Sequence, residues 1–191
     1  MAALQGLHGL MNAYLKFVMN VGLKMLKLIA ILPKSWTRRL IHGFGLIRNP
    51  YTLGVRVIVE DAQNRILLVR HSYLKGWYLP GGAVDAAETL HDAAIREVLE
   101  EAGIYSGSPA TLLNIYLNDR DWGRDRVGLF HLADWSETAS YLQPNKEIAE
   151  ARFFEFDDLP LEITGATLSR IQEFRSGTIP SGGRWISSNH S

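Results

Sequence analysis

The sequence predicts an α/β protein, either an α+β fold or an α/β/α sandwich, with a helical extension at its N-terminus. Two observations predict the fold class: strand-like segments fill the middle of the chain, and two helical segments are interspersed among them. A third observation, the separate composition of the first 49 residues, predicts the extension. With 191 residues, the chain is long enough for one domain with a substantial core in addition to this extension.

Changes of pattern along the chain predict the domain boundaries. The periodicity changes near Pro50, so we expect a basic amphipathic helical extension over residues 1–49 and a compact domain over residues 50–176. The Gly- and Ser-rich residues 177–191 are predicted to form a flexible tail.

The elements of the domain are predicted from alternation, helical spacing and turn residues. Strands are expected at YTLGVRVIVE (51–60), RILLVRH (65–71), 109–118, 124–134 and 151–156. DAQN (61–64) and DRDWG (119–123) are expected as turns, and GWYLPGG (76–82) as a loop. Helices are expected at 88–102, where Gly103 ends the helix, and at 165–174.

The composition excludes several kinds of chemistry. The chain has no cysteine, so it contains no disulfide, no thiolate zinc site and no cysteine nucleophile. The net charge is zero, but residues 1–59 contain eight basic and no acidic residues, which leaves twelve basic and all twenty acidic residues for the rest of the chain. We therefore expect the first part to face an anionic surface and the second part to bind cations.

Three glutamates on the predicted helix 88–102 are candidate metal ligands. Glu97, Glu100 and Glu101 have i, i+3, i+4 spacing, which places them on one face of the helix, where like charges repel each other. A divalent cation such as Mg²⁺ would offset this repulsion, because it binds carboxylate oxygens. A solvated acidic surface is the alternative explanation for three glutamates on a helix.

The loop before this helix is suited to a ligand site. Gly81 and Gly82 let the backbone approach a ligand closely, and Pro80 stiffens the entry to them. Arg96 lies next to Glu97 and can orient a carboxylate or contact a phosphate through its planar guanidinium group.

Residues 82–104 resemble the Nudix box, G-x5-E-x7-R-E-U-x-E-E-x-G-U, in which U is an aliphatic residue. Every fixed position is matched without a gap, by Gly82, Glu88, Arg96, Glu97, Val98, Glu100, Glu101, Gly103 and Ile104. The resemblance extends more loosely from Val55 to Phe174. The departures are Ala83 and Ala87, which stand where many members of the family carry glycine.

The resemblance implies a fold, a reaction and a cofactor. Nudix proteins are α/β/α sandwiches with a mixed sheet, and they hydrolyse a diphosphate linkage joined to another moiety, usually a nucleoside, with Mg²⁺ or Mn²⁺. By the matched positions, Glu97, Glu100 and Glu101 would bind the metal. The Gly82 carbonyl would complete the metal shell, and Glu88 would help to brace the box.

The implied reaction needs a carboxylate that accepts a proton from an activated water. Glu100 is one candidate, and Glu147 or Glu150 in NKEIAEARFF (145–154) are others, because some family members take the base from a loop outside the box. A plain solvated turn is the alternative for that loop. Glu97 and Arg96 are expected to contribute to catalysis as metal ligand and brace.

Residues outside the box must hold the second moiety of the substrate. The candidates are aromatic and basic side chains, namely Tyr73, Trp77, Tyr116 and Trp122 for stacking and Arg70, His71, Lys75 and Arg120 for phosphates. Packing or plain surface positions are the alternative for each of them. The proline typical of ADP-ribose pyrophosphatases is missing, and no coenzyme A or NADH motif is present. The lack of cysteine argues against the related isopentenyl-diphosphate isomerases.

Residues 11–32 are apolar apart from a narrow stripe that contains Lys16, Lys24 and Lys27. These lysines disfavour a transmembrane span, and the lack of a small-residue cleavage site disfavours a secretory signal. Two alternatives stay open: an in-plane helix on an anionic lipid surface, and a helix packed on the domain or on a second subunit. We therefore expect peripheral membrane or homodimer contact through residues 11–45.

These features together predict a cytoplasmic pyrophosphohydrolase, dependent on Mg²⁺ or Mn²⁺, that acts on a small nucleoside diphosphate derivative and has no nucleic-acid partner. The alternative is a Nudix-like module that senses a nucleotide or nucleotide sugar without hydrolysing it. Such modules tend to lose carboxylates of the box, whereas this chain retains all of them.

Overall fold

A computed structural model describes residues 51–119 and 123–185. Its elements are β1 (Thr52–Val59), β2 (Ile66–His71), α3 (Leu90–Ala102), β3 (Ile104–Tyr105), β4 (Thr111–Asn118), β5 (Asp125–Leu132), β6 (Ser136–Glu137), β7 (Ile148–Phe154), α4 (Gly165–Ser176) and β8 (Gly183–Arg184). The extension expected at residues 1–49, with its contact segment 11–45, lies outside the described residues. Among the helices that are described, none is long and apolar enough to cross a membrane.

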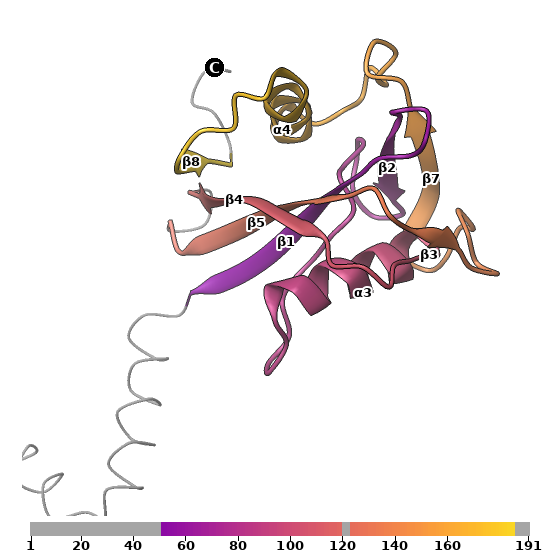
Figure 1. Cartoon of the computed structure of the whole chain (residues 1–191), viewed down its shortest axis with the longest axis horizontal. Coiled ribbons are helices and arrows are strands. Elements are labelled where there is room, and N and C mark those ends of the chain that lie inside the picture. The colour runs from indigo at the N-terminus through magenta and orange to yellow at the C-terminus, as the bar shows by residue number, and fades with distance from the viewer. Residues whose placement is uncertain (1–50, 120–122, 186–191) are drawn as a thin grey trace, which may run out of the picture. The chain divides into compact units, whose positions relative to one another are not determined.

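A mixed four-stranded sheet lies at the centre of the domain, with strand order β1-β5-β4-β8. β1 runs parallel to β5, β4 runs antiparallel to β5, and β8 runs parallel to β4. β2 pairs antiparallel with β7, and β3 pairs antiparallel with β6. Figure 1 shows α3 on one side of the central sheet and α4 on the other, so the predicted α/β/α sandwich with a mixed sheet is confirmed.

The loop predicted at residues 76–82 is bonded to strands on both sides. Tyr78 exchanges two backbone hydrogen bonds of 2.9 Å with Val69 of β2. The Pro80 and Gly82 carbonyls each accept a hydrogen bond of 2.9 Å from an N–H group of β1. The segment thus bridges the central sheet and the β2–β7 pair, which fixes the position of its glycines.

Alternation along the strands divides the core between the two helices. The α3-side core includes the buried residues Val55, Val57, Val59, Leu67, Val69, Ala93, Ala94, Val98 and Ala102. The α4-side core includes the buried residues Ile58, Ile66, Leu68, Leu79, Tyr116, Val127, Leu129, Ile171 and Trp185. Each large aliphatic side chain buried in this way stabilises the fold by about 1.5–3 kcal/mol. Since α3 packs on the sheet through alanines and a valine, its acidic face is turned toward the glycine loop rather than into the apolar core.

α3 begins two residues later than predicted, because Thr89 forms its N-cap. The Thr89 hydroxyl accepts a hydrogen bond from the Asp92 N–H at 3.1 Å, and the Asp92 carboxylate accepts one from the Thr89 N–H at 3.4 Å. The helix ends at Gly103 as predicted, where the left-handed cap residue donates its N–H to the Leu99 carbonyl at 3.0 Å. These caps fix where α3 starts and stops, and therefore where its carboxylates lie.

Two predictions about the later part of the chain were wrong in part. β7 spans residues 148–154 rather than 151–156, because the Asn145 side chain accepts hydrogen bonds from two N–H groups and so begins the strand earlier. The flexible tail expected from residue 177 is wrong for the described residues up to Trp185. β8 pairs with β4 there, and Trp185 is buried, because its indole ring enters the α4-side core.

Candidate active site

The three glutamates predicted as metal ligands line one cleft, between α3 and the loop before β7. The cleft has a volume of about 300 Å³ and is bounded by Glu97, Glu100, Glu101, Asn145, Lys146, Glu147 and Ile148. The exposed fraction of the side chain is 13% for Glu97, 7% for Glu101 and 60% for Glu100. α3 therefore presents two sheltered carboxylates and a third one at the mouth of the cleft.

Arg96 joins α3 to the loop that precedes it. Its guanidinium group donates hydrogen bonds of 2.8 and 3.0 Å to Glu88 and one of 2.9 Å to the Ala83 carbonyl. The same group donates to Glu97 at 2.7 Å and to Glu100 at 3.2 Å. One cation thus holds the loop and two of the three candidate ligands together.

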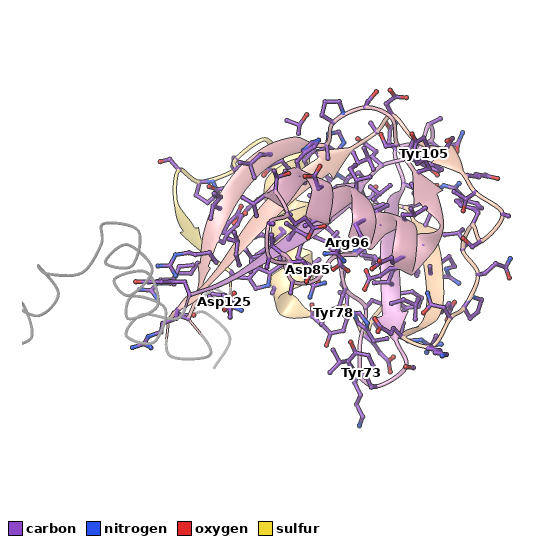
Figure 2. All side chains as sticks on the ribbon, turned by 90° about the horizontal axis from the view of Figure 1, so that it is seen from below. Tyr73, Tyr78, Asp85, Arg96, Tyr105 and Asp125 are labelled. Atoms are coloured by element: carbon purple, nitrogen blue, oxygen red, sulfur yellow. The ribbon has the colours of Figure 1, made fainter. Side chains whose placement is uncertain are left out.

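Glu88 is held in its ionised form by these contacts. Its carboxylate also accepts a hydrogen bond of 2.9 Å from the Asp85 N–H. The Arg96 guanidinium, and after it the Asp85 N–H, lower the pKa of Glu88 to about 2. Figure 2 shows Arg96 on α3 beside the loop that carries Asp85. The Glu88 carboxylate is therefore ionised at neutral pH, where it stays paired with Arg96.

Two glycines bring the loop against the sheltered carboxylates. The Gly81 N–H donates a hydrogen bond of 2.8 Å to Glu101 Oε2, and its φ of 137° is rarely adopted by other residues. A Cβ atom at Gly82 would lie 2.6 Å from Glu97 Oε1, so any other residue there would displace the Glu97 carboxylate. The Gly82 carbonyl, which was predicted to complete the metal shell, already accepts a hydrogen bond from β1, and a metal would use its second lone pair.

The positive charge near Glu97 and Glu101 is too small to offset the effect of burial on their carboxylates. Burial raises the pKa of Glu101 to about 7, against the lowering effects of the Gly81 N–H and Arg56. Burial also raises the pKa of Glu97, against the lowering effect of Arg96. A divalent cation would favour the ionised form of both, and carboxylate oxygens are ligands that Mg²⁺ and Mn²⁺ accept. The donor set thus fits such a metal, although across 51–119 and 123–185 no three His, Asp or Glu side chains already form a compact metal-binding group.

The loop before β7 brings one of the two outside carboxylates to the cleft. Glu147 lines the cleft together with the glutamates of α3. Asn145, which the sequence interpretation did not single out, holds this loop against α3 by donating a hydrogen bond of 2.9 Å to the Glu100 carbonyl. Glu150 does not line the cleft; its carboxylate accepts a hydrogen bond of 2.7 Å from Arg70.

Arg56 is a second residue that the sequence interpretation missed. It projects from β1 and donates hydrogen bonds to the carbonyls of Leu79, at 3.3 Å, and Gly81. Burial lowers the pKa of Arg56, against the raising effects of Glu101 and Glu97. The available signal was a basic residue inside the apolar alternation of YTLGVRVIVE. Arg56 therefore places a positive charge behind the glycine loop.

His71 lies behind the carboxylates rather than beside a phosphate site. Its ring is buried, and Nδ1 lies 4.0 Å from Glu101 Oε1. Burial, followed by the charge of Arg56, lowers the pKa of His71. The predicted role of His71 in phosphate binding is therefore not supported by its position.

The structure corrects two of the predicted base-stacking residues. Tyr116 is fully buried in the α4-side core, and its hydroxyl donates a hydrogen bond of 2.7 Å to Glu173. Trp77 is also buried, and its ring meets Phe154 edge to face with centroids 4.9 Å apart. Both aromatic rings are packed in the core and cannot stack on a substrate base. Their prediction as base-stacking residues was therefore wrong.

Two further residues predicted to bind the substrate, Tyr73 and Arg70, do not line the cleft. Tyr73 is exposed on the loop after β2, and Figure 2 shows it at the tip of that loop. Arg70 is paired with Glu150, and its guanidinium lies over the Trp77 ring. Arg120 and Trp122 lie outside the described residues.

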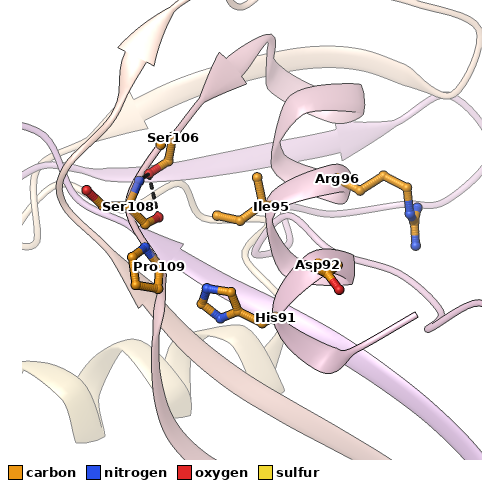
Figure 3. A pocket seen from close by; sticks show the side chains of 8 residues that line it. His91, Asp92, Ile95, Arg96, Ser106, Ser108 and Pro109 are labelled. Carbon is orange, nitrogen blue, oxygen red and sulfur yellow. Dashed lines mark hydrogen bonds between the residues drawn. The ribbon is translucent and has the colours of Figure 1, made fainter. Parts of the chain in front are cut away.

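Two further hollows lie next to α3 and the glycine loop. One, of about 460 Å³, lies between α3 and the loop 106–109 (Figure 3). In Figure 3 Arg96 points away from this loop, and Ser106 is bonded to Ser108. The other, of about 330 Å³, lies on the α4 side of the central sheet and reaches Gly82. Only the second one therefore adjoins the glycine that contacts Glu97.

Comparison with known proteins agrees with this geometry. The family model of the NUDIX domain matches residues 50–172. A Bacillus subtilis protein named "Putative 8-oxo-dGTP diphosphatase" is 33% identical over 135 residues, which cover 66% of this chain and 82% of that protein. The ADP-ribose pyrophosphatase of Methanocaldococcus jannaschii is 32% identical over 134 residues, or 66% of this chain and 78% of that protein.

A solved structure supports the same assignment. The MutT NUDIX hydrolase from Burkholderia pseudomallei is 26% identical, with a TM-score of 0.55, over 65% of this chain and 98% of that chain. From its sandwich fold, its complete box and these matches, we conclude that the chain belongs to the NUDIX family.

Proposed function

We propose that the chain is a Mg²⁺-dependent pyrophosphohydrolase that cleaves the diphosphate linkage of a nucleoside diphosphate derivative. The observation that carries this proposal is the cleft in which the three glutamates of α3 meet Glu147. Two relatives are named for 8-oxo-dGTP and ADP-ribose, and both of these molecules contain such a linkage. Clustered carboxylates are the expected partners of a metal that must also bind a diphosphate.

The sheltered carboxylates Glu97 and Glu101 would hold the metal, with Glu100 added from the mouth of the cleft. When bound, Mg²⁺ neutralises charge on the diphosphate and lowers the pKa of a coordinated water. The loop keeps both sheltered carboxylates in place, because Gly81 donates its N–H to Glu101 and Gly82 leaves room for Glu97. Arg96 keeps Glu97 and Glu100 on the same side of the helix.

Two carboxylates at the cleft are candidates for the general base. Glu100 is bonded to Arg96 at 3.2 Å, which ties it to the box. The Glu147 carboxylate has no hydrogen-bond partner among the side chains described, and it lines the cleft from the loop opposite α3. We therefore assign the base to Glu147 and a ligand role to Glu100.

A hydrolysis panel tests the proposal. The full chain is incubated with Mg²⁺ and compounds that include 8-oxo-dGTP and ADP-ribose, and the products are separated by chromatography. We expect at least one diphosphate to be cleaved, EDTA to abolish the activity, and Glu101→Gln and Glu147→Gln to lower kcat by about 100-fold or more. Glu150→Gln is the matched control, and it should keep kcat within about twofold of the wild type, as expected for a residue outside the cleft.

The outcomes of the panel separate an enzyme from a sensor. Nucleotide binding without cleavage of any compound would contradict the proposal and favour the non-hydrolysing module. Equal losses in Glu147→Gln and Glu150→Gln would remove the assignment of the base to Glu147 while leaving the reaction itself in place.

A further inference from the structure

His71, at the end of β2, is a buried histidine that the proposed reaction leaves without a role. Only 7% of the residue is exposed, and its ring nitrogen Nδ1 is buried without a hydrogen-bond partner in residues 51–119 and 123–185. Buried polar atoms of folded proteins are nearly always bonded, because an unpaired one loses its bonds to water and gains none in return. The groups around Nδ1 therefore show what this histidine can bond to.

Strand alternation turns His71 toward α3. Leu67 and Val69 of β2 lie in the α3-side core, and His71, two residues further on, faces the same side of the strand. The pairing of β2 with β7 skips Ala149 at this point, so His71 stands opposite Ile148, which lines the cleft. The histidine thus ends the row of inward-facing residues of β2 beside the candidate site.

The polar group that faces Nδ1 is the carboxylate of Glu101. Oε1 of Glu101 lies 4.0 Å from Nδ1, and Oε2 accepts the hydrogen bond of 2.8 Å from the Gly81 N–H. Among the described residues, no group donates a hydrogen bond to Oε1. One oxygen of this candidate metal ligand is therefore fixed by the glycine loop, whereas the other one faces the histidine. A movement of about 1 Å would bring Oε1 and Nδ1 to an ordinary hydrogen-bond distance.

Two tyrosine rings hold the imidazole ring in this orientation. The ring centroids of Tyr73 and Tyr78, both labelled in Figure 2, each lie 5.4 Å from that of His71. The Tyr78 hydroxyl in turn donates a hydrogen bond of 2.9 Å to the Lys75 carbonyl. The position of Nδ1 is therefore set by packing, and the ring does not need a hydrogen bond of its own to stay there.

The residue after His71 ties the end of β2 to the loop before β7. The Ser72 N–H donates to the Glu147 carbonyl at 2.8 Å, and the Ser72 hydroxyl donates to the Lys146 carbonyl at 3.0 Å. Lys146 and Glu147 line the cleft opposite α3. His71 is therefore anchored through its neighbour on one side of the cleft and faces a candidate metal ligand on the other side.

We propose that His71 is a positioning residue for the metal: its Nδ1–H group donates a hydrogen bond to Glu101 Oε1 when a divalent cation is bound, and so fixes the orientation of this carboxylate. The inference rests on the proposed function, because it takes Glu101 to be a metal ligand. The role does not depend on the charge of the ring, since Nδ1 carries a proton in the imidazolium and in one of the two neutral tautomers. A carboxylate oxygen has lone pairs for a donor and for a metal, and partners of this kind commonly change metal affinity by about 10- to 100-fold.

Calorimetric titration of the full chain with Mn²⁺ alone tests this proposal. His71→Phe keeps a planar ring but has no donor, and it should bind Mn²⁺ about 10-fold or more weakly than the wild type. His71→Asn, whose amide nitrogen can take the place of Nδ1, should restore most of the affinity. His91→Phe is the matched control and should bind Mn²⁺ like the wild type, because His91 also has a buried ring nitrogen without a partner in the described chain but lies at the other end of α3.

Three results of this titration would overturn the proposal. They are unchanged affinity in His71→Phe, an equal loss in His71→Asn and His71→Phe, which would assign the effect to packing, and no binding of Mn²⁺ by the wild type.

A measurement on the wild type covers the case in which the variants of His71 fail to fold. The ring nitrogens of His71 are observed by NMR in the presence of Mg²⁺, which is diamagnetic. The chemical shift of Nδ1 should be that of a protonated nitrogen, as expected for a donor to Glu101. A chemical shift typical of an unprotonated Nδ1 in the Mg²⁺-bound protein would overturn the proposal, because such a nitrogen cannot donate to a carboxylate.

The proposed function and this inference fail in different ways. If a diphosphate is cleaved but His71→Phe binds Mn²⁺ like the wild type, the positioning role of His71 alone fails. If no diphosphate of the panel is cleaved but His71→Phe loses Mn²⁺ affinity and His91→Phe does not, the proposed reaction fails and the positioning role stands.

Discussion

Arg96 donates two hydrogen bonds to Glu88, of 2.8 and 3.0 Å, across the turn that begins α3. The geometry is bidentate, so it fixes the orientation of the guanidinium group as well as its position. The remaining donors of the group then reach Glu97 and the Ala83 carbonyl. The pair of Arg96 and Glu88 therefore fixes the position of Glu97, although neither Arg96 nor Glu88 is itself a candidate metal ligand.

Arg96→Lys should lower both stability and activity, because one ammonium group cannot keep the two bonds to Glu88 and also reach Glu97. We expect a loss of about 1–3 kcal/mol in the free energy of unfolding, measured in urea, and a clear fall in kcat. Arg65→Lys is the control, since Arg65 forms a comparable pair with Asp61 in the turn between β1 and β2, away from the cleft. Similar effects on kcat in both variants would argue against this role for Arg96.

Gly82→Ala should impair the site while the fold is retained. The added Cβ would lie 2.6 Å from Glu97 Oε1, so the carboxylate must move. We expect kcat to fall about 10-fold or more, because small displacements of catalytic groups are costly. Gly165→Ala is the control, since a Cβ there meets nothing within 4 Å, and it should leave kcat unchanged. Full activity in Gly82→Ala would show that the contact with Glu97 is unimportant.

Glu101 should make the metal-free protein less stable as the pH rises. Its pKa is about 7 in the folded state against the ordinary 4.5, so between these values the folded state binds more protons than the unfolded state. The free energy of unfolding therefore falls from about pH 4.5 to pH 7, by on the order of 3 kcal/mol from this group. Glu101→Gln should remove this dependence.

The measurement is urea unfolding in EDTA at pH 5 and pH 8, for the wild type and for Glu101→Gln. The stability of the variant relative to the wild type should be larger at pH 8, and Mg²⁺ should reduce the difference because it binds the ionised carboxylate. If the difference in the free energy of unfolding between the variant and the wild type did not change with pH, the raised pKa of the buried Glu101 carboxyl would be contradicted.

Tyr116→Phe should affect stability but not substrate binding. The variant loses the hydrogen bond of 2.7 Å to Glu173 and keeps the buried ring. We expect a loss of about 1 kcal/mol, seen as a lower Tm, with KM unchanged. Tyr105→Phe, at an exposed position, should change neither. A rise in KM for Tyr116→Phe alone would restore the original prediction that Tyr116 contacts the substrate.

The sequence predicted the parts of the site that depend on local contacts. The spacing of Glu97, Glu100 and Glu101 places them on one helix face wherever the helix forms, and Gly103 ends that helix through its own backbone. The order of the elements likewise predicted an α+β fold or an α/β/α sandwich, and the resemblance to the Nudix box implied the sandwich. Ala87, noted as a departure from glycine, adopts a φ of 67°, so the alanine is accommodated in a conformation that favours glycine.

The sequence did not predict the parts that depend on distant partners. Trp185 is buried because β8 finds β4, and the Gly and Ser content around it indicated only a tail. In the sequence, Tyr116 is a possible stacking residue. Only the structure shows that it contacts Glu173 and Arg170. Arg56 could be recognised as a charged residue in an apolar strand, but its neighbours on the glycine loop could not.

The division of the core into two separate sides has an evolutionary consequence. Mutations on the α4 side, including those in β8, can reshape the walls of the hollow that reaches Gly82 while the alanines behind α3 keep their packing. Descendants of one ancestor could then vary on the α4 side in small, tolerated steps, with the acidic face of α3 inherited unchanged. The sandwich would in this way keep the conserved α3 side apart from the α4 side, which is free to diverge.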